Sequence, residues 1–156
     1  MVTVWWTARE VIHYSFLPTG QAITSESYCA ELEVVHQKLV KIRPISTTRK
    51  RPVLLHDNAR PHQALKTLQK LAELSYEVLP HPAYSSDLLP TDYHLFRHLD
   101  LFLRDKRFKN QEMVESDFRS FVDSQIPEFF NKGIDDLIEH WQRCVDVNGN
   151  YFGWLW

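Results

Sequence analysis

Two aspartates stand where the chain could hold a divalent cation. Asp57 comes just after the apolar run Val53–Leu55, Asp92 opens a predicted helix, and 34 residues lie between the two. Ligand sites of open α/β sheets lie at the carboxyl ends of strands, and a helix start favours an ionised carboxylate, the oxygen ligand that Mg²⁺ prefers. An Asx turn at Asp57 and a helix cap at Asp92 are the purely structural alternatives.

Positive charge is concentrated in one segment. Residues 34–56 contain six Lys and Arg and no Asp or Glu, whereas residues 111–146 contain nine acidic residues against three basic ones. The basic segment could follow a DNA phosphate backbone by displacing counterions, with Arg49, Lys50 and Arg51 as its candidate contacts. A solvated helix end and loop is the alternative interpretation of the same residues.

For several other side chains, a structural role is favoured over a role in binding a metal ion or a nucleobase. His94 and His98 stand four residues apart and could bind a zinc ion, but the favoured interpretation is that His94 belongs to a longer sequence motif and His98 is a surface residue. Trp5, Trp6 and Trp141 could stack on nucleobases, although packing in the core is favoured for them too.

Composition excludes several classes of protein. With four glycines there is no Gly-rich phosphate loop, and no apolar run is long enough for a spanning helix, so no membrane partner is expected. Cys29 and Cys144 are too few for a disulfide framework or a zinc ribbon, which favours a reducing, intracellular location. A 156-residue chain that is 44% apolar and 24% charged is ordinary material for one globular domain.

The elements that must position the aspartates follow from the apolar pattern. An antiparallel hairpin is predicted from Val2–Trp6 and 13–17, and a helix through Tyr28 and Leu39 is predicted with Thr24 as its N-cap and Pro44 beyond its end. Two further strands are predicted, at 53–55 (buried on both faces) and 76–79, and a loop at 81–91. Four further helices are predicted at 65–72, from Asp92 to Leu103, around 114–122 and over 134–145, with Gly133 between the last two. This order predicts an α/β fold with a mixed sheet flanked by helices.

Two longer motifs carry a resemblance. The stretches LLHDNARPH (54–62) and YSSDLLPTDYHLF (84–96) closely resemble the signature motifs of mariner transposases, and the interval of 34 residues is the one by which that family's catalytic triad is named. The resemblance implies an RNase H-like fold, DNA as partner, and two-metal phosphodiester chemistry with Mg²⁺ or Mn²⁺. It also implies that Asp57 is the second carboxylate of the triad and Asp92 the third.

The same resemblance sets expectations about the extent of the chain. It implies a partial mariner catalytic domain over 1–152, truncated at its N-terminus before the strand that bears the first Asp, and an atypical apolar tail at 153–156. Nuclear DNA cleavage or strand transfer (endonuclease chemistry) is the inherited function, expected to be weak or lost in this chain alone. The alternatives are a non-catalytic DNA-binding or homodimer-forming module and a decayed copy. No small-molecule substrate is implied.

Overall fold

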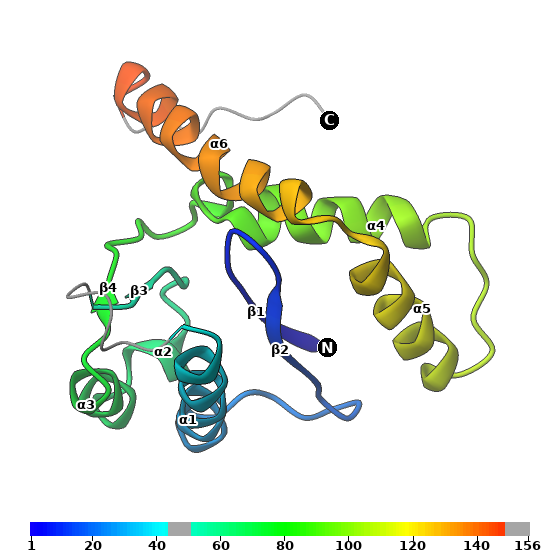
Figure 1. The fold of residues 1–156 in the computed structure, drawn as a ribbon, viewed down its shortest axis with the longest axis horizontal. Coiled ribbons are helices and arrows are strands. Elements are labelled where there is room, and N and C mark those ends of the chain that lie inside the picture. Colours follow the sequence, from blue (N-terminus) through cyan, green and yellow to red (C-terminus); the bar gives the residue numbers. More distant parts are fainter. Residues whose placement is uncertain (44–50, 149–156) are drawn as a thin grey trace. The chain divides into compact units, whose positions relative to one another are not determined.

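The computed structural model describes residues 1–43 and 51–148 (Figure 1). The chain forms two compact units. The first comprises Met1–Trp5 and Ile12–Tyr84, and the second comprises Trp6–Val11 and the chain from Ser85 onward.

The chain opens with the predicted hairpin. Strand β1 covers Val2–Trp6 and strand β2 covers Val11–Phe16, and the two are hydrogen-bonded neighbours. Four residues connect them, closed by a hydrogen bond of 2.9 Å from the Thr7 N–H to the Glu10 carbonyl. Because parallel strands need a connection of a dozen residues or more, this pair is antiparallel.

Helix α1 covers Ser25–Ile42 and begins where its capping signal predicts. The Ser27 N–H donates to Thr24 Oγ1 at 3.1 Å, and the Thr24 N–H donates to Ser27 Oγ at 3.0 Å. This reciprocal capping box satisfies two donors that an α-helix leaves without partners. The helix ends before Arg43, one residue ahead of the proline.

One carboxylate joins α1 to the hairpin. Glu31 accepts hydrogen bonds from Thr3 Oγ1 at 2.9 and 3.0 Å, from Trp5 Nε1 at 2.9 Å, and from Ser15 Oγ. Hydrogen bonds to a charged acceptor are roughly twice as strong as neutral ones. Glu31 therefore binds both strands of the hairpin to the helix within the first unit.

The core of the first unit lies between α1 and α3, which covers Leu65–Glu73. Tyr28, Leu32 and Leu71 are buried there, and partly buried apolar side chains pack around them, including Leu54 and Tyr76. A short helix, α2, covers Arg60–Gln63 ahead of α3.

Strands β3 (Val53–Leu54) and β4 (Glu77–Val78) pair in parallel, with Val53 opposite Glu77 and Leu54 opposite Val78. Both predicted strand orientations are therefore present, in two separate two-stranded sheets. The expectation that Val53 and its neighbours are buried on both faces was wrong, because Val53 is 54% exposed. Pro52 and Pro80 flank the pair, and proline restricts the extension of a hydrogen-bonded ladder.

The second unit is built mainly from helices. A 3₁₀ turn, η2 (Ser86–Leu88), precedes a π-helix, η3 (Thr91–Phe96), which continues into α4 (Arg97–Leu103) as the helix predicted from Asp92. Helices α5 (Gln111–Ser124) and α6 (Pro127–Asp146) follow (Figure 1). The buried apolar side chains of this unit are Leu88, Leu89, Tyr93, Leu95, Leu99, Phe118, Phe121 and Phe130.

Helix α6 begins earlier than the apolar pattern predicts. Its first residue is Pro127, which suits the first helical position because that position needs no N–H donor. Gly133 therefore lies inside α6, and its expected place between two helices was wrong.

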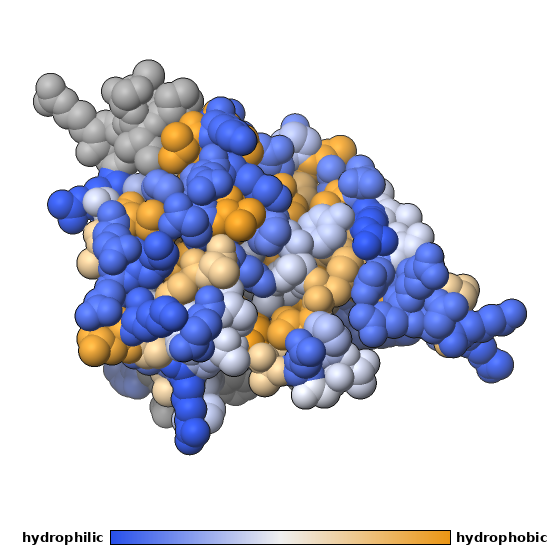
Figure 2. Space-filling view, turned by 90° about the horizontal axis from the view of Figure 1, so that it is seen from below, coloured by the Kyte–Doolittle hydropathy of each residue, from blue (hydrophilic) through white to orange (hydrophobic). Residues whose placement is uncertain are grey.

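The surface mixes polar and apolar residues. On the face shown in Figure 2, hydrophilic residues predominate and smaller hydrophobic areas lie between them. Within the described part of the chain, no helix combines the length and apolar character needed to cross a membrane.

Candidate active site

Asp57 lies just after β3, at the turn that leads into α2. The Ala59 N–H donates to Asp57 Oδ1 at 3.0 Å, which makes the Asx turn considered as the structural alternative. The Asp57 side chain is nevertheless 50% exposed. The turn fixes the carboxylate while leaving it accessible.

His62 is the second group that holds this carboxylate. Its Nδ1 lies 2.7 Å from Asp57 Oδ1 and 3.2 Å from the backbone carbonyl oxygen of the same residue. Because a carbonyl oxygen can only accept, Nδ1 carries the proton and donates to both oxygens. The His62 side chain is 14% exposed, so this contact is largely shielded from solvent.

A stack of rings supports His62. The His56 and His62 rings are nearly parallel, at 5°, with centroids 4.7 Å apart, and the Tyr28 ring centroid lies 4.2 Å from that of His62. Tyr28 Oη and His56 Nδ1 form a buried hydrogen bond of 2.7 Å. We call Tyr28, His56 and His62 the aromatic stack.

Burial keeps two members of the aromatic stack uncharged. It raises the pKa of the Tyr28 hydroxyl well above its ordinary value, and the Asp57 charge acts in the same direction. Burial, followed by the neighbouring His62, lowers the pKa of His56 to about 4. Near pH 7 the stack therefore places neutral Tyr28 and His56 rings behind His62.

Two amide side chains hold the same loop. Asn58 Nδ2 donates to the His81 carbonyl at 2.6 Å, and Gln63 Nε2 donates to Asn58 Oδ1 at 3.3 Å. The loop after β3 is thus tied to the loop after β4. Sequence reasoning identified Asp57 but missed the roles of Asn58, His62 and Tyr28, of which only the first two lie within the motif.

Asp92 lies in the first turn of η3 and is half-buried. Its N–H donates to the Leu89 carbonyl at 2.9 Å. At the adjacent position, Thr91 Oγ1 accepts a hydrogen bond of 3.0 Å from Trp6 Nε1. Short π-helices are rare and occur frequently at functional sites, so this backbone is consistent with a functional Asp92.

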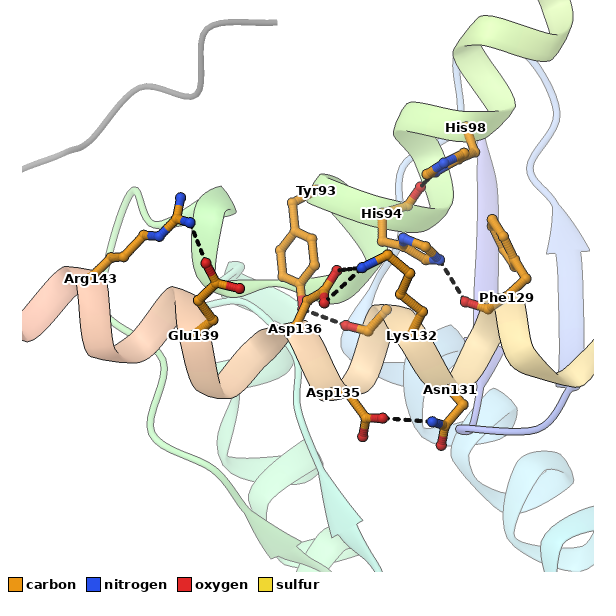
Figure 3. Close-up of polar contacts among 11 residues, drawn as sticks. Tyr93, His94, His98, Phe129, Asn131, Lys132, Asp135, Asp136, Glu139 and Arg143 are labelled. Carbon is orange, nitrogen blue, oxygen red and sulfur yellow. Dashed lines mark hydrogen bonds and ion pairs between the residues drawn. The ribbon is translucent and has the colours of Figure 1, made fainter.

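Side chains of the π-helix form hydrogen bonds with the backbone of helix α6 (Figure 3). Tyr93 Oη donates to the Gly133 carbonyl at 2.5 Å, and His94 Nε2 donates to the Phe129 carbonyl at 2.7 Å. His98 Nδ1 donates at 2.6 Å to the His94 carbonyl, within the π-helix. These bonds hold the element that carries Asp92.

The same contacts explain the two histidines. His98 is exposed, so its predicted surface position is confirmed, whereas His94 is buried. Burial lowers the pKa of His94, and the neighbouring His98 acts in the same direction. One nitrogen of each ring binds a carbonyl oxygen, which leaves that nitrogen no lone pair for zinc.

Tryptophans Trp5 and Trp6 take part in packing, as favoured from the sequence. Trp5 lies 5.2 Å from the ring of Tyr28, and Trp6 lies 6.0 Å from that of Phe130, between centroids. Their indole N–H groups donate to Glu31 and Thr91 respectively. Both rings are partly buried.

Part of the acidic charge of the C-terminal helices is paired along α6. Lys132 Nζ lies 3.0 Å from Asp136, and Arg143 pairs with Glu139, one helical turn apart in each case (Figure 3). Asn131 also donates to Asp135, at 2.6 Å. These pairs lie on an exposed helix surface, where such contacts contribute little to stability.

The remaining predicted site residues are placed as follows. Asp57 belongs to the first unit and Asp92 to the second. Arg49 and Lys50 lie outside the described residues, while Arg51 is exposed just before β3. Across residues 1–43 and 51–148, no three His, Cys, Asp or Glu side chains are grouped to hold a metal ion.

Comparison with known proteins gives a consistent set of relatives. A family model described as transposase (partial DDE domain) matches residues 1–49. Over 152 residues the chain is 58% identical to human histone-lysine N-methyltransferase SETMAR and 38% identical to the mariner Mos1 transposase of Drosophila mauritiana. These matches cover 97% of this chain but 22% and 44% of the two relatives, so the chain spans less than half the length of either.

Solved structures of Mos1 are similar to this fold. The crystal structure of the Mos1 catalytic domain matches with a TM-score of 0.92 and 37% identity, over 97% of this chain and 75% of that chain. The Mos1 catalytic domain has also been solved with Mg and with Mn, and Mos1 has been solved in a paired-end complex with the left transposon end.

Proposed function

The chain belongs to the mariner family of transposases, as a segment of the catalytic domain, and we propose that Asp57 and Asp92 each serve it as a ligand of divalent cations in DNA-strand cleavage or transfer. The resemblance read from the two motifs is thus confirmed, together with the RNase H-like fold class.

The position of Asp57 is the observation that carries this proposal. Its carboxylate is half-exposed at the end of a strand, and both of its hydrogen bonds, from Ala59 and His62, end on Oδ1. A fixed, accessible, anionic oxygen ligand suits hard cations such as Mg²⁺ and Mn²⁺. Such cations, when bound, activate the attacking oxygen and stabilise the leaving oxygen of a phosphodiester.

The other residues of the chain orient the two carboxylates. His62 and the Asx turn hold Asp57, and the hydrogen bond between Trp6 and Thr91 fixes the turn beside Asp92. The bonds from η3 to α6 restrain the same turn. Because these contacts already hold the two carboxylates, less free energy is spent on ordering them when a cation binds. Preorganised ligands of this kind raise the affinity of a protein for a cation.

DNA is the proposed partner. Mos1 has been solved with a transposon end, and this chain carries six Lys and Arg without an acidic residue over 34–56. Of the three candidate contacts, Arg51 is exposed at the edge of the described residues. Because the proposed substrate is DNA, we also propose a nuclear location, and imaging of the tagged chain in cells tests it.

The first experiment measures Mn²⁺ binding to the 156-residue chain by electron paramagnetic resonance, with plasmid nicking in Mg²⁺ and Mn²⁺ alongside. We expect Asp57→Asn and Asp92→Asn each to weaken Mn²⁺ binding at least about tenfold and to abolish any nicking. Asp100→Asn is the matched control, since that carboxylate is 77% exposed on α4 and pairs with Arg104 one turn further along the helix. Unchanged Mn²⁺ affinity in both variants, with DNA still retarded in a gel, would replace this proposal by a non-catalytic DNA-binding function.

A further inference from the structure

The carboxylate of Asp57 is held from within its own motif, five residues away. We propose that His62 is a positioning residue that sets the orientation of the Asp57 carboxylate for cation binding. This inference rests on the proposed function of Asp57 as a cation ligand. It adds a residue whose contribution the motif alone does not reveal.

His62 contacts two oxygen atoms of Asp57 with a single nitrogen. Its Nδ1–H is shared between Asp57 Oδ1, at 2.7 Å, and the Asp57 carbonyl oxygen, at 3.2 Å. Rotation of the carboxylate about its Cβ–Cγ bond would break the first contact and also the bond from the Ala59 N–H. The plane of the carboxylate is therefore fixed relative to the backbone that bears it.

The His62 ring packs against two other rings. It lies parallel to His56, with 4.7 Å between centroids, and against the buried Tyr28 at 4.2 Å. Because the ring is ordered by this packing before any cation arrives, orienting Asp57 costs no further side-chain entropy at binding. The Tyr28–His56 hydrogen bond of 2.7 Å fixes the ring behind it.

His62 acts through Asp57 and is not a cation ligand through this nitrogen. The nitrogen that faces Asp57 carries the proton, so it has no lone pair to offer a metal. Partners of this kind, which orient a ligand without touching the metal, typically change metal affinity by about 10–100-fold when removed.

Two substitutions separate the hydrogen bond from the packing. His62→Phe keeps an aromatic ring in the stack and removes the donor. His62→Asn places an amide N–H at the same distance from the backbone as Nδ1 and removes the ring. For each variant of the full chain, Mn²⁺ affinity is measured by electron paramagnetic resonance and the unfolding midpoint by urea titration.

We expect His62→Phe to weaken Mn²⁺ binding about tenfold or more with little change in the urea midpoint. His62→Asn should retain Mn²⁺ affinity to within about threefold while lowering the midpoint, since it loses ring contacts. Equal Mn²⁺ affinity in the parent and His62→Phe would overturn the inference. So would a loss of affinity in His62→Asn as large as that in His62→Phe.

A metal-free measurement keeps this test separate from the proposed function. In protein with ¹⁵N-labelled histidine, we expect the His62 signal to report a proton on Nδ1, and Asp57→Leu to move the signal toward the other tautomer. An Nδ1 without a proton in the parent chain would overturn the positioning role by itself. If Asp57→Asn binds Mn²⁺ as well as the parent does, the proposed function fails, whatever the His62 tautomer.

Discussion

Gly133 lies directly against the imidazole ring of His94. A Cβ atom built on Gly133 would lie 2.8 Å from His94 Cγ and 3.1 Å from Nε2, and closer still to Cδ2. Real Cβ atoms essentially never approach another heavy atom within 3.0 Å. The π-helix that carries Asp92 can therefore pack on α6 only because residue 133 has no side chain.

Gly133→Ala is expected to destabilise the chain by about 1–3 kcal/mol, because the added methyl group forces His94 out of place. The measurement is urea unfolding followed by far-UV circular dichroism. The same substitution in a His94→Ala background serves as the control. There it should be neutral or stabilising by up to about 1 kcal/mol, since alanine favours a helix over glycine. Equal losses in both backgrounds would contradict the steric explanation.

Glu31→Ala should cost roughly 2–3 kcal/mol in the free energy of unfolding, because three side-chain donors lose a charged acceptor. Glu33→Ala, on the same helix, is the control. The Glu33 side chain is 41% exposed and pairs with Lys70 at 3.1 Å, a surface contact whose loss should leave the urea midpoint nearly unchanged. If both substitutions shift the midpoint equally, Glu31 does not tie the hairpin to α1 in the way the contacts indicate.

Stability is expected to fall as the pH is lowered from about 6.5 to 4. The pKa of His56 is lowered by burial to about 4 from an ordinary value of 6.5. In this interval the unfolded chain binds a proton that the folded chain rejects, so the free energy of unfolding decreases by at most about 1.4 kcal/mol per pH unit for this group.

Urea unfolding across that interval tests the pH dependence. His56→Asn should reduce the slope of the free energy of unfolding against pH. Some slope should remain, because the pKa of His94 is lowered in the same direction. A slope identical to that of the parent chain would remove His56 as the cause.

The hydrogen bond from Trp6 to Thr91 should appear as a coupling free energy between substitutions of the two residues. Trp6→Phe and Thr91→Val each remove one partner of the 3.0 Å hydrogen bond, and the double variant removes both. A double-mutant cycle of unfolding free energies should give a coupling energy of about 1 kcal/mol. Additive effects would mean that the hydrogen bond does not stabilise the turn beside Asp92.

Local signals in the sequence predicted local structure well. The start of α1 follows from Thr24, whose side chain can satisfy the first turn, and its end precedes Pro44. By contrast, no local pattern shows that Gly133 belongs inside a helix, because the reason is a ring 39 residues away in the chain. The exposure of Val53 was missed for a related reason, since a short apolar run does not reveal how many strands will cover it.

In the candidate site, too, the sequence predicted the local features and missed those that depend on long-range contacts. The motifs identified Asp57 and Asp92 and included His62, because all three lie within continuous stretches of sequence. The aromatic stack depends on Tyr28, which lies on α1 and approaches the motif only after folding. Support by long-range packing is therefore the part of the site that sequence reasoning could not supply.

The π-helix also gives two neighbouring turns an opposite response to a change in chain length. Its hydrogen bonds span five residues instead of four, so the turn between Asp92 and Arg97 accommodates one residue more than an α-helix would. Deleting that residue would restore α-helical hydrogen bonds and leave Asp92 facing nearly the same direction relative to α4. Inserting or deleting one residue within α4, which has ordinary α-helical turns, would instead rotate Asp92 by roughly 100° about the axis relative to the end of that helix, although both sequence motifs would be intact.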